Sequence, residues 1–259
     1  MANDTVGKTL IVAVLLCIVC SVLVSTATVK LKPLQEANKK QFTRTNILKA
    51  AGLWEKGVDV NKAFQHIERR FVDLSTGEYD TPENPKNYDA RRAVRNKELS
   101  IEIPDQKDLA DIQRRVKTAE VYLIKRDEQV DGIILPVYGK GLWSTMYGFL
   151  ALEEDGNTVK GLSFYDHGET PGLGGEIENP QWQEQWEEKK VYDENGDLAI
   201  EVLKGKVDTS KPDAIHKIDG LSGATLTTKG VHNMMRYWLG EHGFADFLSN
   251  LRKEGVSNG

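Results

Sequence analysis

The sequence contains very little cysteine, and this scarcity excludes several kinds of site. Its 259 residues include only two cysteines, Cys17 and Cys20, and both lie inside an apolar N-terminal run. The region after Cys20 therefore holds neither disulfide bonds nor cysteine-ligated iron–sulfur clusters. The two cysteines can be read as a C-x-x-C redox pair or as small hydrophobic residues, and their apolar setting favours the second interpretation.

Other combinations of reactive side chains are missing as well. No Ser–His–Asp or Cys–His arrangement can be proposed, so no nucleophilic catalyst is predicted. A net charge of −5, with Lys and Arg interspersed among Asp and Glu, argues against nucleic acid as a partner. The five histidines show no paired ligand spacing, so no metal site is predicted: His66, His167, His216, His232 and His242.

One long apolar run is present near the N-terminus. Leu10 to Val29 contains no charged residue, and a helix of about twenty residues spans the roughly 30 Å of a membrane's hydrocarbon core. A cleaved signal peptide is the alternative, because Lys8 precedes the run and Ser25–Ala27 is small enough for a cleavage site. The length favours a retained transmembrane helix at 10–29, preceded by a tail at 1–9.

The charges around this run bear on its orientation. Lys8 precedes it, whereas five basic residues follow: Lys30, Lys32, Lys39, Lys40 and Arg44. By the positive-inside rule, this excess places the following domain in the cytoplasm.

The remaining chain changes from helical to strand-like patterns. Helices are predicted at Leu34–Ala51, which ends before Gly52, and at Val60–Val72, where Phe64, Ile67 and Phe71 align. Thr76–Asn87 is rich in Gly and Pro and is predicted to be a loop.

Strand patterns dominate from Glu120 onward. Ile133–Tyr138 is a buried apolar run, and two hairpins are predicted, one between Phe149–Leu152 and Val159–Tyr165 and one between Val191–Asp193 and Leu198–Leu203. Helices follow at Thr227–Leu239 and Phe244–Leu251. Without βαβ alternation, the pattern predicts an α+β fold: an N-terminal transmembrane helix, then a mixed domain with an antiparallel sheet core and flanking helices. Residues 30–115 form its helical and loop part, and 116–259 its second part.

The most informative segment is Asp219–Thr228, which reads Asp-Gly-Leu-Ser-Gly-Ala-Thr-Leu-Thr-Thr. One helix face follows it, with apolar residues at i, i+3, i+4, i+7 and i+8: Val231, Met234, Met235, Trp238 and Leu239. A small-residue loop that leads into a helix offers free N–H groups to a phosphate. The alternative is that Ser222 or Thr225 only caps the helix. The segment is not a P-loop, because it lacks the Gly-Lys-Ser/Thr of that motif.

This segment resembles the recognition sequence of flavin transferases, which esterify FMN through its phosphate to a threonine hydroxyl. The whole chain resembles the family of C subunits of bacterial Na+-translocating NADH:quinone oxidoreductases, and more distantly the G subunits of Rnf complexes. The acceptor threonine of the family's Ser-Gly-Ala-Thr falls on Thr225. The resemblance implies a covalent FMN there, with 116–259 as the FMN-binding domain.

The resemblance also implies contacts close to the attachment point. Gly223 and Ala224 leave room for the ribityl phosphate, and Ser222 can donate a hydrogen bond to it. Asp219 is read by the transferase or orients the loop, although a lone carboxylate is also typical of a surface turn. Lys206 is a further candidate, because its charge could balance that of the phosphate.

Two more loops are implied to contact the flavin ring. In His167–Gly175 the family resemblance selects Glu169, Thr170, Gly172 and Leu173, with Leu173 against the ring face and Thr170 near a polar edge. In Gly139–Thr145 it selects Leu142, Trp143, Ser144 and Thr145. From the residues alone, the first loop could be a long turn without a ligand, and Trp143 could be a core residue.

The function implied is electron transfer inside a respiratory complex of the bacterial inner membrane, which oxidises NADH, reduces quinone and exports Na+. The chain would pass electrons through its FMN, while the NADH, quinone and Na+ sites would lie on other subunits, so no complete active site is expected here. Its partners would be those membrane subunits, a flavin transferase and membrane lipid. The resemblance implies a periplasmic soluble domain, against the charge rule, and we follow the resemblance. Two alternatives remain: a flavin carrier of an Rnf-type, ferredoxin-dependent complex, and a membrane-tethered scaffold without redox activity.

Overall fold

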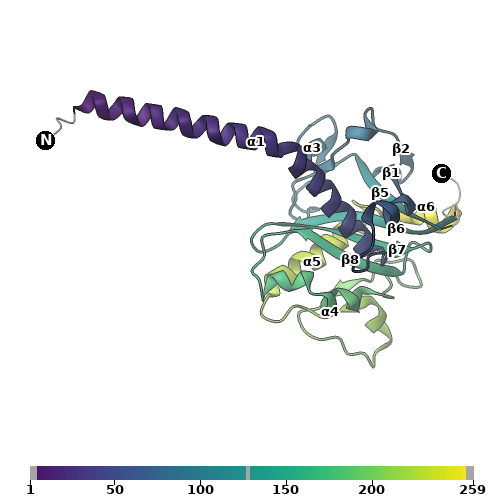
Figure 1. Cartoon of the computed structure of the whole chain (residues 1–259). Helices are drawn as coiled ribbons and strands as arrows, with labels where there is room; N and C mark the ends of the chain where they lie inside the picture. The colour runs from purple at the N-terminus through teal and green to yellow at the C-terminus, as the bar shows by residue number, and fades with distance from the viewer. Residues whose placement is uncertain (1–4, 127–128, 255–259) are drawn as a thin grey trace. The chain divides into compact units, whose positions relative to one another are not determined.

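The structure is a computed structural model that describes residues 5–126 and 129–254. It comprises two units, Met1–Thr43 and Arg44–Gly259. Residues 1–4 of the predicted tail 1–9, and the last residues of the predicted 116–259 domain, lie outside the described residues. The elements, with η for short 3-10 helices, follow in chain order (Figure 1): α1 Val6–Ala50, α2 Val60–Ala63, η1 Phe64–His66, β1 Ile67–Asp73, β2 Tyr79–Asp80, η2 Pro85–Asn87, α3 Ala90–Ala93, β3 Ser100–Glu102, β4 Arg114–Val116, β5 Thr118–Arg126, β6 Gln129–Lys140, β7 Thr145–Glu153, β8 Val159–Asp166, η3 Gly174–Glu178, α4 Pro180–Gln183, η4 Glu184–Trp186, β9 Glu201–Val202, η5 Pro212–His216, β10 Lys217–Ile218, α5 Thr225–Trp238 and α6 Ala245–Glu254.

The predicted transmembrane segment and the helix predicted after it form one continuous helix, α1. It begins at Val6 and ends at Ala50, with Pro33 inside it. The following Gly52 has a φ of 68°, a left-handed conformation that ends helices. Among the described residues, α1 is the one helix long and apolar enough to cross a membrane, a test that a signal sequence near the N-terminus also passes.

A six-stranded antiparallel sheet forms the centre of the second unit. Its strand order is β2-β1-β5-β6-β7-β8. The predicted hairpin around Asp155–Asn157 is confirmed, because β7 pairs with β8 from Tyr147 to Leu152. The predicted α+β class with an antiparallel core is therefore correct.

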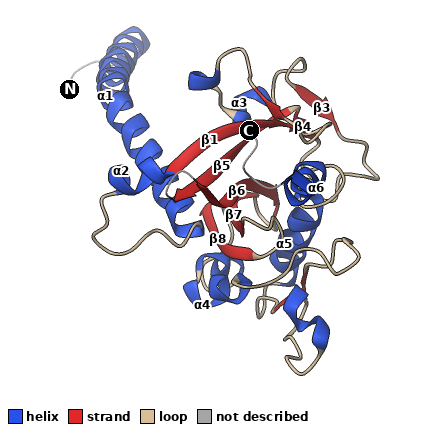
Figure 2. Ribbon diagram, turned by 90° about the vertical axis from the view of Figure 1, so that its right-hand side faces the viewer, coloured by secondary structure: helices blue, strands red, loops and turns tan. Residues whose placement is uncertain are grey.

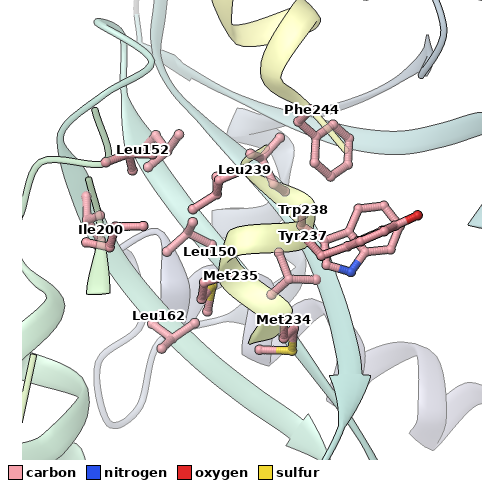
Figure 3. Packing of buried hydrophobic residues seen from close by; sticks show 14 of the residues in the cluster. Leu150, Leu152, Leu162, Ile200, Met234, Met235, Tyr237, Trp238, Leu239 and Phe244 are labelled. Carbon is pink, nitrogen blue, oxygen red and sulfur yellow. The ribbon is translucent and has the colours of Figure 1, made fainter. Parts of the chain in front are cut away.

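Alternating side chains give this sheet two buried faces. In β6, Ile133 and Leu135 belong to the larger apolar cluster, whereas Ile134 between them belongs to the smaller one. This period of two is the expected pattern of a strand covered on both sides. Helices α5 and α6, which lie side by side in Figure 2, both contribute side chains to the larger cluster. The predicted apolar face of α5 meets the sheet there: in Figure 3 Met234, Met235 and Leu239 lie beside Leu150 and Leu162.

The end of α1 covers the other face of the sheet. Ile47 and Leu48 are buried together with Ile134 in the smaller cluster. A buried polar pair joins the same elements, because the Ser163 hydroxyl of β8 donates to Asn46 Oδ1 at 3.0 Å. The last turns of α1 are therefore packed onto the sheet and are part of the second unit.

Gly161 makes this packing possible, and its replacement gives a testable prediction. A Cβ at Gly161 would lie 2.5 Å from the carbonyl oxygen of Ala50, so Gly161→Ala must displace the end of α1. We expect a loss of about 1–3 kcal/mol in the free energy of unfolding, measured by urea denaturation. Gly205→Ala is the matched control, because nothing lies within 4 Å of its Cβ. Equal stabilities of the two variants would contradict this account.

The helix predicted at Val60–Val72 is wrong for most of its length. Only Val60–Ala63 is α-helical, and from Ile67 to Asp73 the chain is strand β1, paired with β5 over its whole length. The spacing of four between Ile67 and Phe71 fits both a helix face and one side of a strand, so periodicity alone could not decide. Pairing with β5, which is distant in the sequence, makes this segment a strand.

The second predicted hairpin is only partly present. Tyr192 and Leu198 form a single bridge across the Asn195–Gly196 turn. Beyond it, β9 pairs in parallel with β10 instead of continuing the hairpin. The two C-terminal helices are confirmed, since α5 and α6 begin within two residues of their predicted starts. The predicted loop Thr76–Asn87 is also confirmed, because it contains only the short β2 and η2.

Candidate functional site

Three predicted segments meet at one end of the sheet. Gly141–Ser144 is the turn between β6 and β7, His167–Leu173 follows β8, and α5 begins at Thr225. Because β7 and β8 are neighbours in the sheet, the first two loops emerge side by side. The third is held against them by a single carboxylate, that of Glu169.

Glu169 binds two of the segments at once. Its side chain is buried, with 4% of the residue exposed. Its oxygens accept the main-chain N–H groups of Leu142 at 3.1 Å and Trp143 at 2.9 Å, with a longer contact to the N–H of Ser144 at 3.5 Å. They also accept the hydroxyl of Thr227, in the first turn of α5, at 2.5 Å. Glu169 therefore fixes the turn and the helix start relative to its own loop.

Two glycines leave room for this carboxylate. A Cβ at Gly141 would lie 2.5 Å from Glu169 Oε1, and a Cβ at Gly174 would lie 2.9 Å from Oε2. Any larger residue at either position would displace the carboxylate. A further tie joins the two loops, since the N–H of Gly168 donates to the Ser144 hydroxyl at 2.6 Å.

The hydrogen bonds determine the charge of Glu169. Burial by itself raises the pKa of a carboxyl group. Here the hydrogen bonds from Thr227 and from the N–H groups of Trp143, Leu142 and Ser144 outweigh burial, so the pKa of Glu169 lies below its ordinary value of 4.5. Glu169 is therefore an anion at neutral pH, and these hydrogen bonds stabilise its negative charge.

Thr225 is the first residue of α5, and its side chain is exposed. The cap position is Ala224, which offers no side-chain hydrogen bond. The interpretation of Ser222 or Thr225 as the helix cap is therefore wrong. The first intrahelical bond runs from the N–H of Thr228 to Ala224 O, so the preceding N–H groups of the first turn point outward without helical acceptors. Gly223 has a φ of 72°, which favours glycine at this bend.

Large apolar side chains are exposed on the three segments that Glu169 joins. They are Leu142 (42%), Trp143 (66%), Leu173 (45%) and Leu226 (59%). The prediction that Trp143 could be a core residue is excluded by this exposure. Leu173 lies against the Thr225 loop, because a Cβ at Gly223 would be 3.3 Å from Leu173 Cδ2. Four exposed apolar side chains on segments that Glu169 joins, together with the exposed hydroxyl of Thr225, indicate a surface for a flat apolar ligand.

The other predicted residues have mainly structural positions. Asp219 Oδ1 accepts the N–H of Val207 at 2.7 Å, and Asp219 O accepts Trp182 Nε1 at 2.8 Å. Asp219 therefore holds the loop that contains Val207 against its own segment. Lys206 is exposed on the loop that Asp219 holds. Thr170 O accepts the N–H groups of Leu173 and Gly175, which closes the turn that contains Gly172.

Comparison with known proteins assigns this site to a family. Residues 141–240 match the model of the FMN-binding domain. The chain is 46% identical over 262 residues to the C subunit of the Na(+)-translocating NADH-quinone reductase of Yersinia pestis, covering 99% of this chain and 97% of the relative. It is 48% identical to the C subunit of the Pseudomonas aeruginosa reductase, covering 98% of this chain and 99% of the relative. The chain belongs to the NqrC family, the C subunits of Na+-translocating NADH-quinone reductases.

Two solved structures agree with this assignment to the NqrC family. The crystal structure of Shewanella oneidensis NqrC matches with a TM-score of 0.76 and 36% identity, covering 84% of this chain and 100% of that one. The C subunit of the Parabacteroides distasonis reductase matches with a TM-score of 0.64 and 26% identity, covering 85% and 97%. Family membership replaces the alternatives of an Rnf-type carrier and a scaffold, and with α1 it supports a membrane-anchored chain.

Sequence reasoning missed two features of this NqrC-family site. It did not single out Thr227, whose hydroxyl donates to Glu169, because a threonine two residues after Thr225 looks like part of the same motif. It also did not single out Leu226, whose exposure follows only from its place on the outer side of α5. The glycines around Glu169 were visible as a glycine-rich loop, but their role required the fold.

Thr227 and Thr225 give a matched pair of stability predictions. Thr227→Val keeps the β-branched shape but removes the hydrogen bond to Glu169, so it should lower the free energy of unfolding by about 1–2 kcal/mol. Thr225→Val should change it by no more than about 0.5 kcal/mol, because Thr225 is exposed and does not cap α5. Urea denaturation of the flavin-free full chain measures both. A comparable loss for Thr225→Val would restore the capping interpretation.

Proposed function

We propose that this chain is the electron-carrying subunit of a membrane-bound Na+-translocating NADH:quinone reductase, with FMN attached by a phosphoester to Thr225. The observation that carries the proposal is the exposed, non-capping hydroxyl of Thr225, at the start of a helix that Glu169 joins to two loops with exposed apolar side chains. Similarity to two NqrC-family relatives over 99% and 98% of the chain supports it.

The start of α5 suits the phosphate. The first-turn N–H groups have no helical acceptors, and the positive end of the helix dipole favours an anion. Gly223 and Ala224 place no long side chain in front of the hydroxyl, and the exposed Ser222 can donate a hydrogen bond. These residues would hold the phosphate, with Asp219 fixing the loop behind them.

The two adjoining loops suit the ring. Leu142, Trp143 and Leu173 would contact its apolar faces, and the exposed Thr170 would meet a polar edge. Ser144 and Thr145 close the turn that presents Trp143, Gly172 shapes the opposite loop, and Glu169 holds the loops in place. When bound, FMN supplies reversible acceptance and donation of electrons.

Attachment requires a balanced group transfer. A flavin transferase would take FMN from a donor in which its phosphate is activated as a phosphoanhydride. The Thr225 hydroxyl forms the new bond to phosphorus, the anhydride bond to the leaving nucleotide breaks, and the hydroxyl proton passes to the enzyme or solvent. The exposure of Thr225 lets the transferase reach it.

The rest of the complex would supply the sites that this chain lacks. We assign oxidation of NADH, reduction of quinone and export of Na+ to the partner subunits and their interfaces. Helix α1 would anchor the chain in the lipid of the bacterial inner membrane. We propose a periplasmic domain at 44–259, although the basic residues after Val29 favour the opposite side.

The test is the intact mass of the full chain from a host that has the transferase. The expected result is a gain of one FMN less one water, with in-gel flavin fluorescence that survives denaturation and a modified peptide that contains Thr225. An unmodified mass from such a host would contradict the covalent attachment. A modification on another residue would leave the carrier function but move the site.

A further inference from the structure

The first turns of α5 carry an unusual distribution of charge. The fourteen residues from Thr225 to Trp238 include no Asp or Glu. Their basic side chains are Lys229, His232 and Arg236. All of them lie C-terminal to Thr225 at helical spacings of four, seven and eleven residues, so they form a stripe on the same side of the helix as Thr225.

Lys229 is the member of this stripe nearest to Thr225. Residues four apart on a helix have Cβ atoms about 5–6 Å from each other. Helical side chains also lean toward the N-terminus of their helix. The Lys229 side chain is exposed, and its flexible stem can therefore place the ammonium beside a group attached to Thr225 Oγ.

The other two members of the stripe are already engaged. His232 Nδ1 accepts the N–H of Val202 at 3.3 Å, and burial lowers the pKa of His232, which keeps it neutral at physiological pH. Arg236 donates to Leu198 O at 3.4 Å. Within residues 5–126 and 129–254, Lys229 forms no ion pair and its ammonium donates no hydrogen bond. Glu169, the carboxylate tied to α5, is satisfied by the turn and Thr227.

We infer that Lys229 is the counter-ion of the FMN phosphate, holding it at the start of α5 by a charge-assisted contact. The inference rests on the proposed attachment at Thr225. Lys206, the cation predicted from the sequence, lies on a separate loop held by Asp219, whereas Lys229 is one helical turn from the acceptor. Lys229 would act both before attachment, on the phosphate of the donor, and after it, on the phosphoester.

The first experiment measures the rate of FMN attachment to the full chain by purified transferase. An exposed ion pair changes an equilibrium or rate by about two- to fivefold. Lys229→Gln should therefore slow attachment by about two- to fivefold, Lys229→Arg should restore most of it, and the control Lys253→Gln should match wild type. The difference should shrink between about 0.05 M and 0.5 M salt, because salt screens exposed charges.

The second experiment isolates the phosphate from the transferase. In the Thr225→Ala chain, which cannot be esterified, the dissociation constants of FMN and riboflavin are compared with and without Lys229→Gln. FMN should bind about two- to fivefold more weakly without Lys229, whereas riboflavin, which has no phosphate, should be unaffected. If neither flavin binds this chain measurably, the attachment rates of the first experiment decide whether Lys229 contacts the phosphate.

The outcomes separate this inference from the proposed function. A wild-type chain that stays unmodified contradicts the attachment itself. A wild-type chain that is modified at the same rate as Lys229→Gln overturns the role of Lys229 alone. Equal weakening of FMN and riboflavin also overturns it, because Lys229 would then act on the ring.

Discussion

Thr225→Ala is expected to abolish covalent flavin completely, while the domain stays folded. The exposed hydroxyl of Thr225 is the proposed nucleophile, and alanine leaves no oxygen for the phosphoester. Intact mass and in-gel fluorescence after production with the transferase measure the loss. Because Thr225 does not cap α5, the free energy of unfolding of the flavin-free chain should stay within about 0.5 kcal/mol of wild type.

Two further variants show whether the position or the hydroxyl matters. Thr225→Ser keeps a hydroxyl at the start of α5 and should retain some attachment. Thr227→Ala removes the neighbouring hydroxyl, which is buried and bonded to Glu169, and should not remove the acceptor. Full loading of Thr225→Ala, or loss of loading only in Thr227→Ala, would place the acceptor elsewhere.

Replacement of Glu169 is expected to produce the largest loss of stability in the site. Glu169→Ala leaves the N–H groups of Leu142 and Trp143 and the Thr227 hydroxyl without their acceptor. Leaving buried donors unpaired costs about 1–3 kcal/mol or more when the lost partner was charged. We expect the free energy of unfolding at pH 7 to fall by about 2–4 kcal/mol, with a smaller fall for Glu169→Gln, whose amide keeps one acceptor oxygen.

The pH dependence of this loss provides an independent check. In the folded chain the pKa of Glu169 lies below its ordinary value of 4.5. The stability from ionised Glu169 is therefore fully present above about pH 4.5 and is lost as pH falls through the lower folded pKa. Denaturation curves of wild type and Glu169→Gln should diverge at pH 7 and converge in acid. A constant difference across this range would show that Glu169 contributes by shape and not by charge.

The sequence predicted the elements whose signals are local. The hairpin around Asp155–Asn157 has turn residues between apolar runs, and the apolar face of α5 repeats at helical spacing, so both were found. Strand β1 was not found, because its partner β5 lies about fifty residues away and its spacing also fits a helix. The parallel pair β9 and β10 was missed because Leu198–Leu203, which contains β9, was predicted to pair with Val191–Asp193 across a local turn, whereas β9 pairs with β10.

The candidate site was predicted in part. The resemblance gave Thr225 and the two loops, and the fold brings them to one end of the sheet. The role of Glu169 could not be read from the sequence, since it depends on how the N–H groups of a separate turn point. The structure therefore gives Glu169 a supporting role behind the proposed flavin surface.

The contacts of Glu169 also bear on how this surface can change during evolution. Its carboxylate holds the turn through the main-chain N–H groups of Leu142 and Trp143, which almost any amino acid would supply. Substitutions of these two side chains can therefore alter the polarity of the proposed flavin surface while the turn keeps its hydrogen bonds to Glu169. Evolution or protein engineering can vary the side chains at Leu142 and Trp143, on the proposed flavin surface, while Glu169, Gly141 and Gly174 keep the backbone unchanged.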